Sequence, residues 1–142
     1  SIGPKLIASG PNYVITERIT GEPIEQALAH STKTKARKLL QAILTQLRIM
    51  DKLKINKKEM NHPQKHIIVS KKNKPTLIDF ERCYKTENPK NITQFMHYCK
   101  KLNKKFKLDL NTKKIERSAK NYKKNQTEKN FKILLNLFSS KP

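Results

Sequence analysis

Residues 58–82 read KEMNHPQKHIIVSKKNKPTLIDFER and form the most informative stretch of the chain. Residues 66–69 are a short apolar run rich in β-branched side chains, which is typical of a strand. A charged segment that ends at Pro75 predicts a turn, and residues 76–80 predict the return strand. Asp79 lies inside that second strand, where an unpaired carboxylate is costly. The stretch therefore predicts a hairpin that brings Asp79 opposite the polar loop preceding the first strand, a layout suited to holding a metal ion and phosphates.

This hairpin resembles the catalytic loop and metal-binding strand of the protein-kinase fold. In that fold a loop of the form H-x-D-x-x-x-x-N leads into an apolar strand, and a second strand ends in D-F-G. Residues 78–81, IDFE, match the second motif, with Glu81 in place of the glycine. The segments HPQKHIIV and LIDFER are most similar to small archaeal proteins described as predicted Ser/Thr kinases, relatives of the RIO-type and lipopolysaccharide-core kinases.

The resemblance implies roles for individual residues. Asp79 would hold Mg²⁺ against the phosphates of ATP, and His66 would be an atypical metal ligand or a phosphate contact at the position of the family's Asn. Asn61 falls at the position of the catalytic Asp but cannot accept a proton as a carboxylate does. Asn61 and the neighbouring imidazole of His62 would therefore orient or deprotonate the acceptor hydroxyl. Lys65 lies two residues out of register with a lysine that steadies the γ-phosphate in kinases.

The N-terminal residues predict a strand pair. Residues 5–8 form a short, mainly apolar segment that begins with Lys5. A turn sequence follows, and residues 13–18 favour a second strand. By the same resemblance these are the last two strands of a kinase N-lobe, leading into a hinge at residues 17–19. Hinge backbone groups hydrogen-bond the adenine edge in that family, so Glu17 and Ile19 are the expected ATP contacts.

A long amphipathic helix is the clearest secondary-structure prediction. Its apolar side chains recur at intervals of three and four residues, at Ala36, Leu40, Ile43, Leu47 and Met50. Ser31 or Thr32 would cap it. A shorter helix is predicted before it, starting at Glu22 and Pro23 and ending near His30. In the kinase fold a long central helix likewise lies directly before the catalytic loop.

Further helices are expected after the hairpin. Asn91 would cap the first, Asp109 or Asn111 the second, and Thr127 would begin the last. The expected fold is thus α+β. It is a protein-kinase-like C-lobe, mainly helical, with a small β-hairpin at the catalytic site and an N-terminal strand pair.

The implied function is ATP- and Mg²⁺-dependent phosphotransfer to a hydroxyl-bearing protein or small molecule. Residues 1–20 would be the end of the N-lobe strands and the hinge, and residues 21–142 the helical C-lobe. The family's Gly-rich loop and strand lysine find no match in this sequence, which holds three glycines. We therefore expect additional sequence upstream of Ser1, and little or no phosphotransfer by these 142 residues alone. Asn61 at the base position leaves a pseudokinase as an alternative.

The composition is strongly basic. Lysine and arginine number 32 against 11 acidic residues, a formal charge of +21, which predicts attraction to polyanions. Residues 100–142 hold 14 of the basic residues and 3 of the acidic ones. A module that binds RNA, another nucleic acid or a ribosomal particle through these helices is therefore a second alternative. The simpler interpretation is that most of the lysines lie on solvated helix faces.

Two isolated cysteines, Cys83 and Cys99, form no C-x-x-C pair, which favours a reducing compartment and gives no sign of a zinc site. No run approaches the length of a membrane span, and no signal-peptide pattern is present. The sequence thus predicts a cytoplasmic protein without a membrane partner.

Overall fold

The structure is a computed structural model that describes residues 2–139, and it is a mixed α+β protein, as predicted. The described helices are α1 (Ile24–Ala29), α2 (Lys33–Lys52), α3 (Asn91–Phe106), α4 (Thr112–Lys124) and α5 (Glu128–Asn136), with a 3₁₀ helix, η1 (Lys58–Asn61). The strands are β1 (Leu6–Gly10), β2 (Tyr13–Thr16), β3 (Glu22–Pro23), β4 (Ile55–Asn56), β5 (Ile67–Val69), β6 (Pro75–Leu77) and β7 (Tyr84–Lys85).

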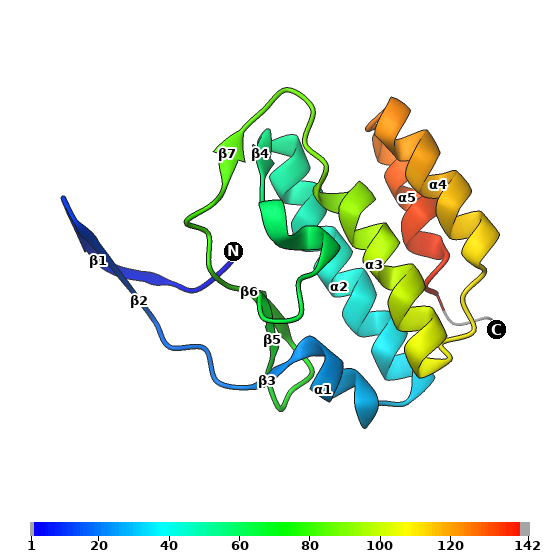
Figure 1. Ribbon diagram of the computed structural model, residues 1–142, viewed down its shortest axis with the longest axis horizontal. Coiled ribbons are helices and arrows are strands. Elements are labelled where there is room, and N and C mark those ends of the chain that lie inside the picture. The colour runs from blue at the N-terminus through cyan, green and yellow to red at the C-terminus, as the bar shows by residue number, and fades with distance from the viewer. Residues whose placement is uncertain (1, 140–142) are drawn as a thin grey trace.

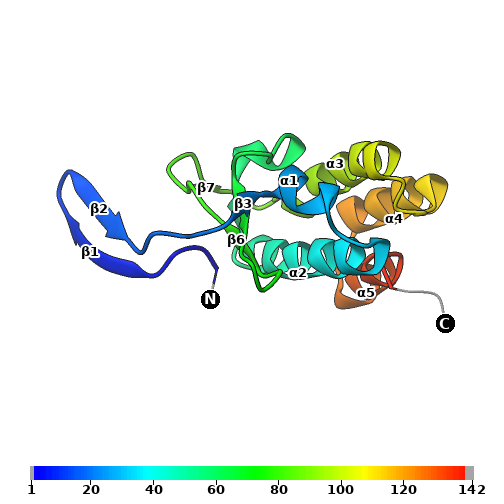
Figure 2. The same ribbon diagram turned by 90° about the horizontal axis from the view of Figure 1, so that it is seen from below.

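Four of the helices form the body of the protein. Helices α2 and α5 lie in one layer and α3 and α4 in the other, as Figure 2 shows, and consecutive members contact one another. The apolar stripe of α2 predicted from the sequence fills the space between them, with Leu40, Ile43, Leu44 and Leu47 fully buried. This core fixes the direction of α2, whose C-terminal end leads into η1 and the hairpin β5–β6 (Figure 1).

A buried polar cluster ties these helices together. Asp51 accepts hydrogen bonds from the Asn91 amide (2.8 Å) and the Tyr122 hydroxyl (2.9 Å), and Arg48 donates to the same hydroxyl (3.0 Å). Burial raises the pKa of Asp51, although the hydrogen bonds from Asn91 and Tyr122 oppose that shift. Because three helices contribute to it, the cluster fixes α3 and α4 against the end of α2.

The helix starts depend on local side-chain chemistry, and most were predicted correctly. Thr32, Asn111 and Thr127 are the N-caps of α2, α4 and α5, and each accepts a hydrogen bond from a backbone N–H one turn later. The prediction that Asn91 caps α3 was wrong, because Lys90 is the N-cap. The Asn91 side chain instead accepts from the Lys57 N–H (2.7 Å) and donates to Asp51 and to a backbone carbonyl.

A three-stranded antiparallel sheet, ordered β3-β5-β6, lies against the start of α1 and one side of α2. Glu22 and Pro23, predicted as the first helical residues, form its edge strand β3, and α1 begins only at Ile24. Gly21 allows this pairing, because a Cβ at that position would lie 2.2 Å from the Val69 carbonyl oxygen.

The hairpin β1–β2 extends away from the helical body (Figures 1 and 2). These two strands pair only with each other among the described residues. Ile7 and Val14 are 64% and 69% exposed, and no residue of the two strands is buried. Isolated two-stranded hairpins are only marginally stable, so this segment is the least supported part of the described fold.

No helix within residues 2–139 combines sufficient length with sufficient apolar character to cross a bilayer.

Candidate functional site

The hairpin β5–β6 brings His66 and Asp79 together. Ile67 pairs with Leu77, and the Ile78 N–H donates to the His66 carbonyl at 2.9 Å. The side chains just beyond this ladder therefore share the open end of the hairpin, with His66 Nδ1 3.7 Å from Asp79 Oδ2. The His66 side chain is 19% exposed and the Asp79 side chain 48% exposed, so the pair lies at the surface with its imidazole largely covered.

Asp79 lies outside the strand in which it was predicted. Strand β6 ends at Leu77, and Asp79 has φ 63°, in the left-handed region. Aspartate tolerates this region better than most residues, although it remains uncommon. The turn redirects the backbone so that the Asp79 carbonyl accepts a hydrogen bond from the Lys57 ammonium. The conformation of Asp79 is thus held by a side chain distant in sequence.

Lys57 is fully buried, which is unusual for a lysine. Its ammonium lies 3.2 Å from Glu59 Oε2, donates to the Asp79 carbonyl and lies 5.1 Å from the centroid of the Phe80 ring. Three partners of this kind compensate for the loss of water around the charge. The buried ammonium therefore links Glu59 to the backbone of Asp79.

Glu59 is a second carboxylate at this site, and the sequence-based reasoning missed it. Its side chain is 10% exposed. Burial alone would raise the pKa of Glu59, but the hydrogen bond and charge of Lys57, a backbone hydrogen bond and the charge of His66 together lower it. Glu59 is therefore ionised at neutral pH. A possible sequence signal was that Glu59 and Asp79 are the acids closest to the two ends of the hairpin.

An imidazole nitrogen without a hydrogen-bond partner within the described residues suggests that the site could hold a metal ion. His66 Nδ1 is buried and forms no hydrogen bond within the described residues. Metal ions bind imidazole nitrogen and carboxylate oxygen at about 2.0–2.2 Å. Two donors 3.7 Å apart can therefore share one ion. The donor pair fits Mg²⁺ or Mn²⁺, although Mg²⁺ prefers oxygen ligands.

The protein would supply only part of such a coordination shell. Among the described residues no group of three or more His, Cys, Asp or Glu side chains is arranged to hold a metal. Mg²⁺ in phosphoryl-transfer sites is commonly held by one or two carboxylates together with substrate phosphates and water. A site with few protein ligands therefore suits a metal that arrives with a nucleotide better than a permanently bound structural ion.

The residues proposed for acceptor chemistry precede His66 in the sequence but are not joined to the His66–Asp79 pair within the described residues. Asn61 ends η1 and is exposed, as is Lys65. His62 is exposed too, and its Nδ1 lies 3.5 Å from the Lys101 ammonium of α3. Within residues 2–139 none of these side chains forms a hydrogen bond or ion pair with Asp79.

The expected hinge residues line a cavity whose described walls include neither His66 nor Asp79. Glu17 and Ile19 line a cavity of about 140 Å³ with Gly3, Thr76 and neighbouring residues. The Glu17 N–H donates to the Lys5 carbonyl (2.9 Å), so it is not available to a ligand. In the described part of the chain, the Glu17 carbonyl and the Ile19 N–H form no backbone hydrogen bond, which leaves one acceptor and one donor available for an adenine edge.

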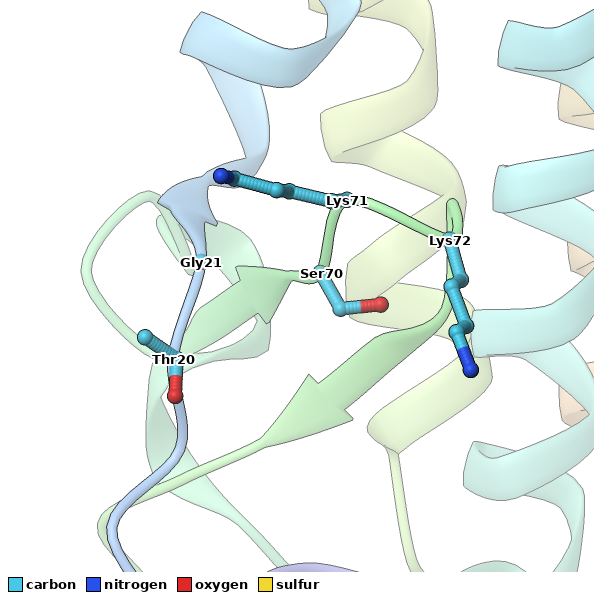
Figure 3. Close-up of a pocket in the computed structure, with 5 residues that line it drawn as sticks. All are labelled: Thr20, Gly21, Ser70, Lys71 and Lys72. Carbon is cyan, nitrogen blue, oxygen red and sulfur yellow. The ribbon is translucent and has the colours of Figure 1, made fainter.

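A larger cavity, of about 450 Å³, is lined by Thr20, Gly21, Ser70, Lys71 and Lys72. It lies at the turn of the hairpin β5–β6, at the opposite end from His66 and Asp79. Figure 3 shows that the Lys71 and Lys72 side chains diverge from the loop. Because the two ammonium groups do not converge, this cavity is not a preformed phosphate site.

Comparisons with known proteins identify no relative. No family model matches the chain, and neither the curated proteins nor the solved structures contain a significant match. Any function must therefore be argued from the site itself.

Proposed function

We propose that this chain is the hinge and C-lobe portion of an atypical protein-kinase-like phosphotransferase that uses ATP and Mg²⁺. The observation that supports this most is the buried His66 Nδ1, which has no hydrogen-bond partner within residues 2–139 and lies 3.7 Å from the Asp79 carboxylate at the open end of a hairpin. Buried polar atoms without a partner are rare and call for an explanation, and of the three within the described residues, His66 Nδ1 is the nitrogen that can ligate a metal. A metal shared with Asp79 supplies such an explanation.

The remaining roles in the proposal follow from position. Mg²⁺ would offset charge on the phosphates of ATP during transfer. Asp79 and His66 would hold that ion, the Lys57 ammonium fixes the backbone of Asp79, and the Glu17 carbonyl and Ile19 N–H would contact adenine.

In this proposal, the residues that face the acceptor hydroxyl assist the transfer of the γ-phosphoryl group. The acceptor oxygen bonds to the γ-phosphorus as the bond from that phosphorus to ADP breaks, and the hydroxyl proton passes to His62. Asn61 orients that hydroxyl, and Lys65 contacts the γ-phosphate. If the protein binds metal and nucleotide through these contacts but never transfers phosphate, it is a pseudokinase.

The test is metal and nucleotide binding by the ¹⁵N-labelled chain. Mn²⁺, a paramagnetic substitute for Mg²⁺, is expected to broaden the amide signals of residues 66–67 and 78–80 first, and ATP with Mg²⁺ is expected to shift those of residues 17–19. Phosphate transfer from ATP by this chain is expected to be undetectable. Broadening centred on exposed carboxylates elsewhere, such as Glu87, would contradict the proposed site, and robust ATP turnover with contaminating kinases excluded would contradict the expected inactivity.

A basic nucleic-acid-binding module is the second candidate. Helix α4 exposes Lys113, Lys114, Lys120, Lys123 and Lys124, and none of them forms an ion pair in the described structure. An electrostatic RNA site on this helix predicts affinity that falls steeply with salt and falls again when three of these lysines are changed to glutamine. Fluorescence anisotropy with a labelled RNA oligomer measures both effects. Binding absent at moderate salt would remove this candidate.

A cytoplasmic location is also part of the proposal. Both cysteines are free thiols, Cys83 half-buried and Cys99 buried, as expected for a protein in a reducing compartment.

A further inference from the structure

A third cavity lies near the proposed metal site, where the charges of Asp79 and Glu59 act on the Cys83 thiol in its lining. It has a volume of about 440 Å³ and is lined by Lys58, Arg82, Cys83 and Tyr84. The cavity is wide open to solvent, and its volume falls within the range of about 300–1,000 Å³ that is common for small-molecule pockets. Its walls come from η1 and from the segment that enters β7, which pairs with β4 through Asn56 and Tyr84.

Two cations line this cavity. The Lys58 ammonium lies 5.6 Å from the centroid of the Tyr84 ring. The Arg82 side chain is 62% exposed, and its Nε lies 3.8 Å from Glu59 Oε1, beyond hydrogen-bonding distance. Within residues 2–139 the Arg82 guanidinium forms no hydrogen bond with the protein. Its donors therefore remain available to a ligand, and a guanidinium favours bidentate binding of phosphate.

The negative charges nearby are largely compensated. Glu59 is paired with the buried Lys57, so Arg82 is not its main partner. Burial raises the pKa of the Cys83 thiol, which keeps that wall of the cavity uncharged. Glu81 is exposed and adjacent in sequence, and it is the remaining carboxylate that an anion would meet there.

A chain of contacts connects this cavity to the metal site. After Asp79 the chain reverses in a turn closed by the Cys83 N–H donating to the Phe80 carbonyl at 3.1 Å. This turn returns Arg82 to Glu59, and Glu59 shares the Lys57 ammonium with the Asp79 carbonyl. A ligand held by Arg82 is therefore linked through Glu59 to the Lys57 ammonium, which holds the backbone of Asp79.

We propose that the cavity lined by Lys58, Arg82, Cys83 and Tyr84 binds the phosphate group of a small phosphorylated acceptor, whose free hydroxyl is then presented to the metal site. This inference rests on the proposed function and adds a substrate class to it. Lys58 and Arg82 bind the phosphate, and the exposed Tyr84 ring supports the body of the acceptor.

The test uses ribose 5-phosphate, inorganic phosphate and uncharged ribose as probes of the ¹⁵N-labelled chain. Ribose 5-phosphate is expected to shift the amide signals of residues 58 and 82–84, inorganic phosphate to shift the same signals more weakly, and ribose to shift none. The double variant Lys58→Gln with Arg82→Gln is expected to weaken ribose 5-phosphate binding by roughly tenfold or more. Lys85→Gln, which removes an exposed lysine from β7, is the matched control and is expected to bind like the original chain.

Other outcomes overturn the assignment. Equal weakening by Lys85→Gln, or shifts scattered over the lysine-rich helices, would show general charge attraction in place of a site. An RNA oligomer that shifts the same signals at lower concentration than ribose 5-phosphate would identify the ligand as nucleic acid. The double variant is expected to leave Mn²⁺ broadening at residues 66–67 and 78–80 intact. If the unsubstituted chain shows no Mn²⁺ broadening at these residues, the metal site is refuted, and the acceptor role is refuted with it. Binding of ribose 5-phosphate at residues 58 and 82–84 can still be measured in that case, so the two failures are distinguishable.

Discussion

Asp79→Asn is expected to abolish Mn²⁺ broadening at residues 66–67 and 78–80. The variant keeps the shape of the side chain and removes the one full negative charge of the donor pair. Loss of an outer partner of a metal ligand alone typically lowers metal affinity about 10- to 100-fold, so loss of a direct charged ligand is expected to cost at least as much. The measurement is an Mn²⁺ titration followed by amide line widths, with His66 as the reporter on the opposite side of the ion.

Glu81→Gln is the matched control for this variant. Glu81 is an exposed carboxylate two positions from Asp79, and in the described structure it enters neither a hydrogen bond nor an ion pair. If Glu81→Gln and Asp79→Asn weaken Mn²⁺ binding equally, the ion responds to local surface charge and the proposed coordination is incorrect.

His66→Ala would remove the other donor while leaving the carboxylate in place. The two variants together therefore separate chelation from simple electrostatic attraction, because attraction by the Asp79 charge alone does not require the imidazole. A smaller loss for His66→Ala than for Asp79→Asn follows from the preference of Mg²⁺ and Mn²⁺ for oxygen over nitrogen.

Features governed by neighbouring residues could be predicted from the sequence. The caps Thr32, Asn111 and Thr127 bind backbone N–H groups three residues away, so the pattern of residues contains the information needed. The stripe of α2 and the pairing of β5 with β6 depend on periodicity and on a short turn, which are also local. The juxtaposition of His66 and Asp79 followed from that pairing.

Features governed by distant residues could not be predicted. Asn91 has the sequence signature of a cap, but its amide is used by Lys57 and Asp51, which are 34 and 40 positions away. Glu22 and Pro23 favour a helix start, yet β5 offers them hydrogen bonds and they pair with it as a strand. Tertiary contacts override local preference at such positions.

The central ammonium of the site was the least predictable feature. Lys57 is one of 32 basic residues, and the pattern around it resembles that of its exposed neighbours. Its burial arises because Glu59, the Asp79 carbonyl and the Phe80 ring converge on one point. Glu59 was missed for the same reason, since its role depends on a partner whose burial is visible only in three dimensions.

Lys57→Met tests whether this ammonium supports both the fold and the metal site. Methionine fills a similar volume without the charge, so the expected effect comes from the partners left behind, Glu59 and the Asp79 carbonyl. Removing one member of a buried ion pair typically destabilises a protein by about 3–5 kcal/mol, and we expect a loss near the lower end because the Glu59 side chain retains 10% exposure. Urea unfolding followed by circular dichroism measures the free energy of unfolding.

The control and the second readout separate the two roles of Lys57. Lys85→Met alters an exposed lysine and is expected to change stability by less than about 0.5 kcal/mol. Adding Glu59→Gln to Lys57→Met removes the unpaired buried charge, so the double variant should be more stable than the sum of the single effects predicts.

In the double variant the Asp79 backbone still lacks its donor, and Mn²⁺ affinity should fall roughly tenfold even where stability is recovered. Unchanged Mn²⁺ affinity in that variant would show that Lys57 supports the fold alone, and that the left-handed turn at Asp79 is held by the chain itself.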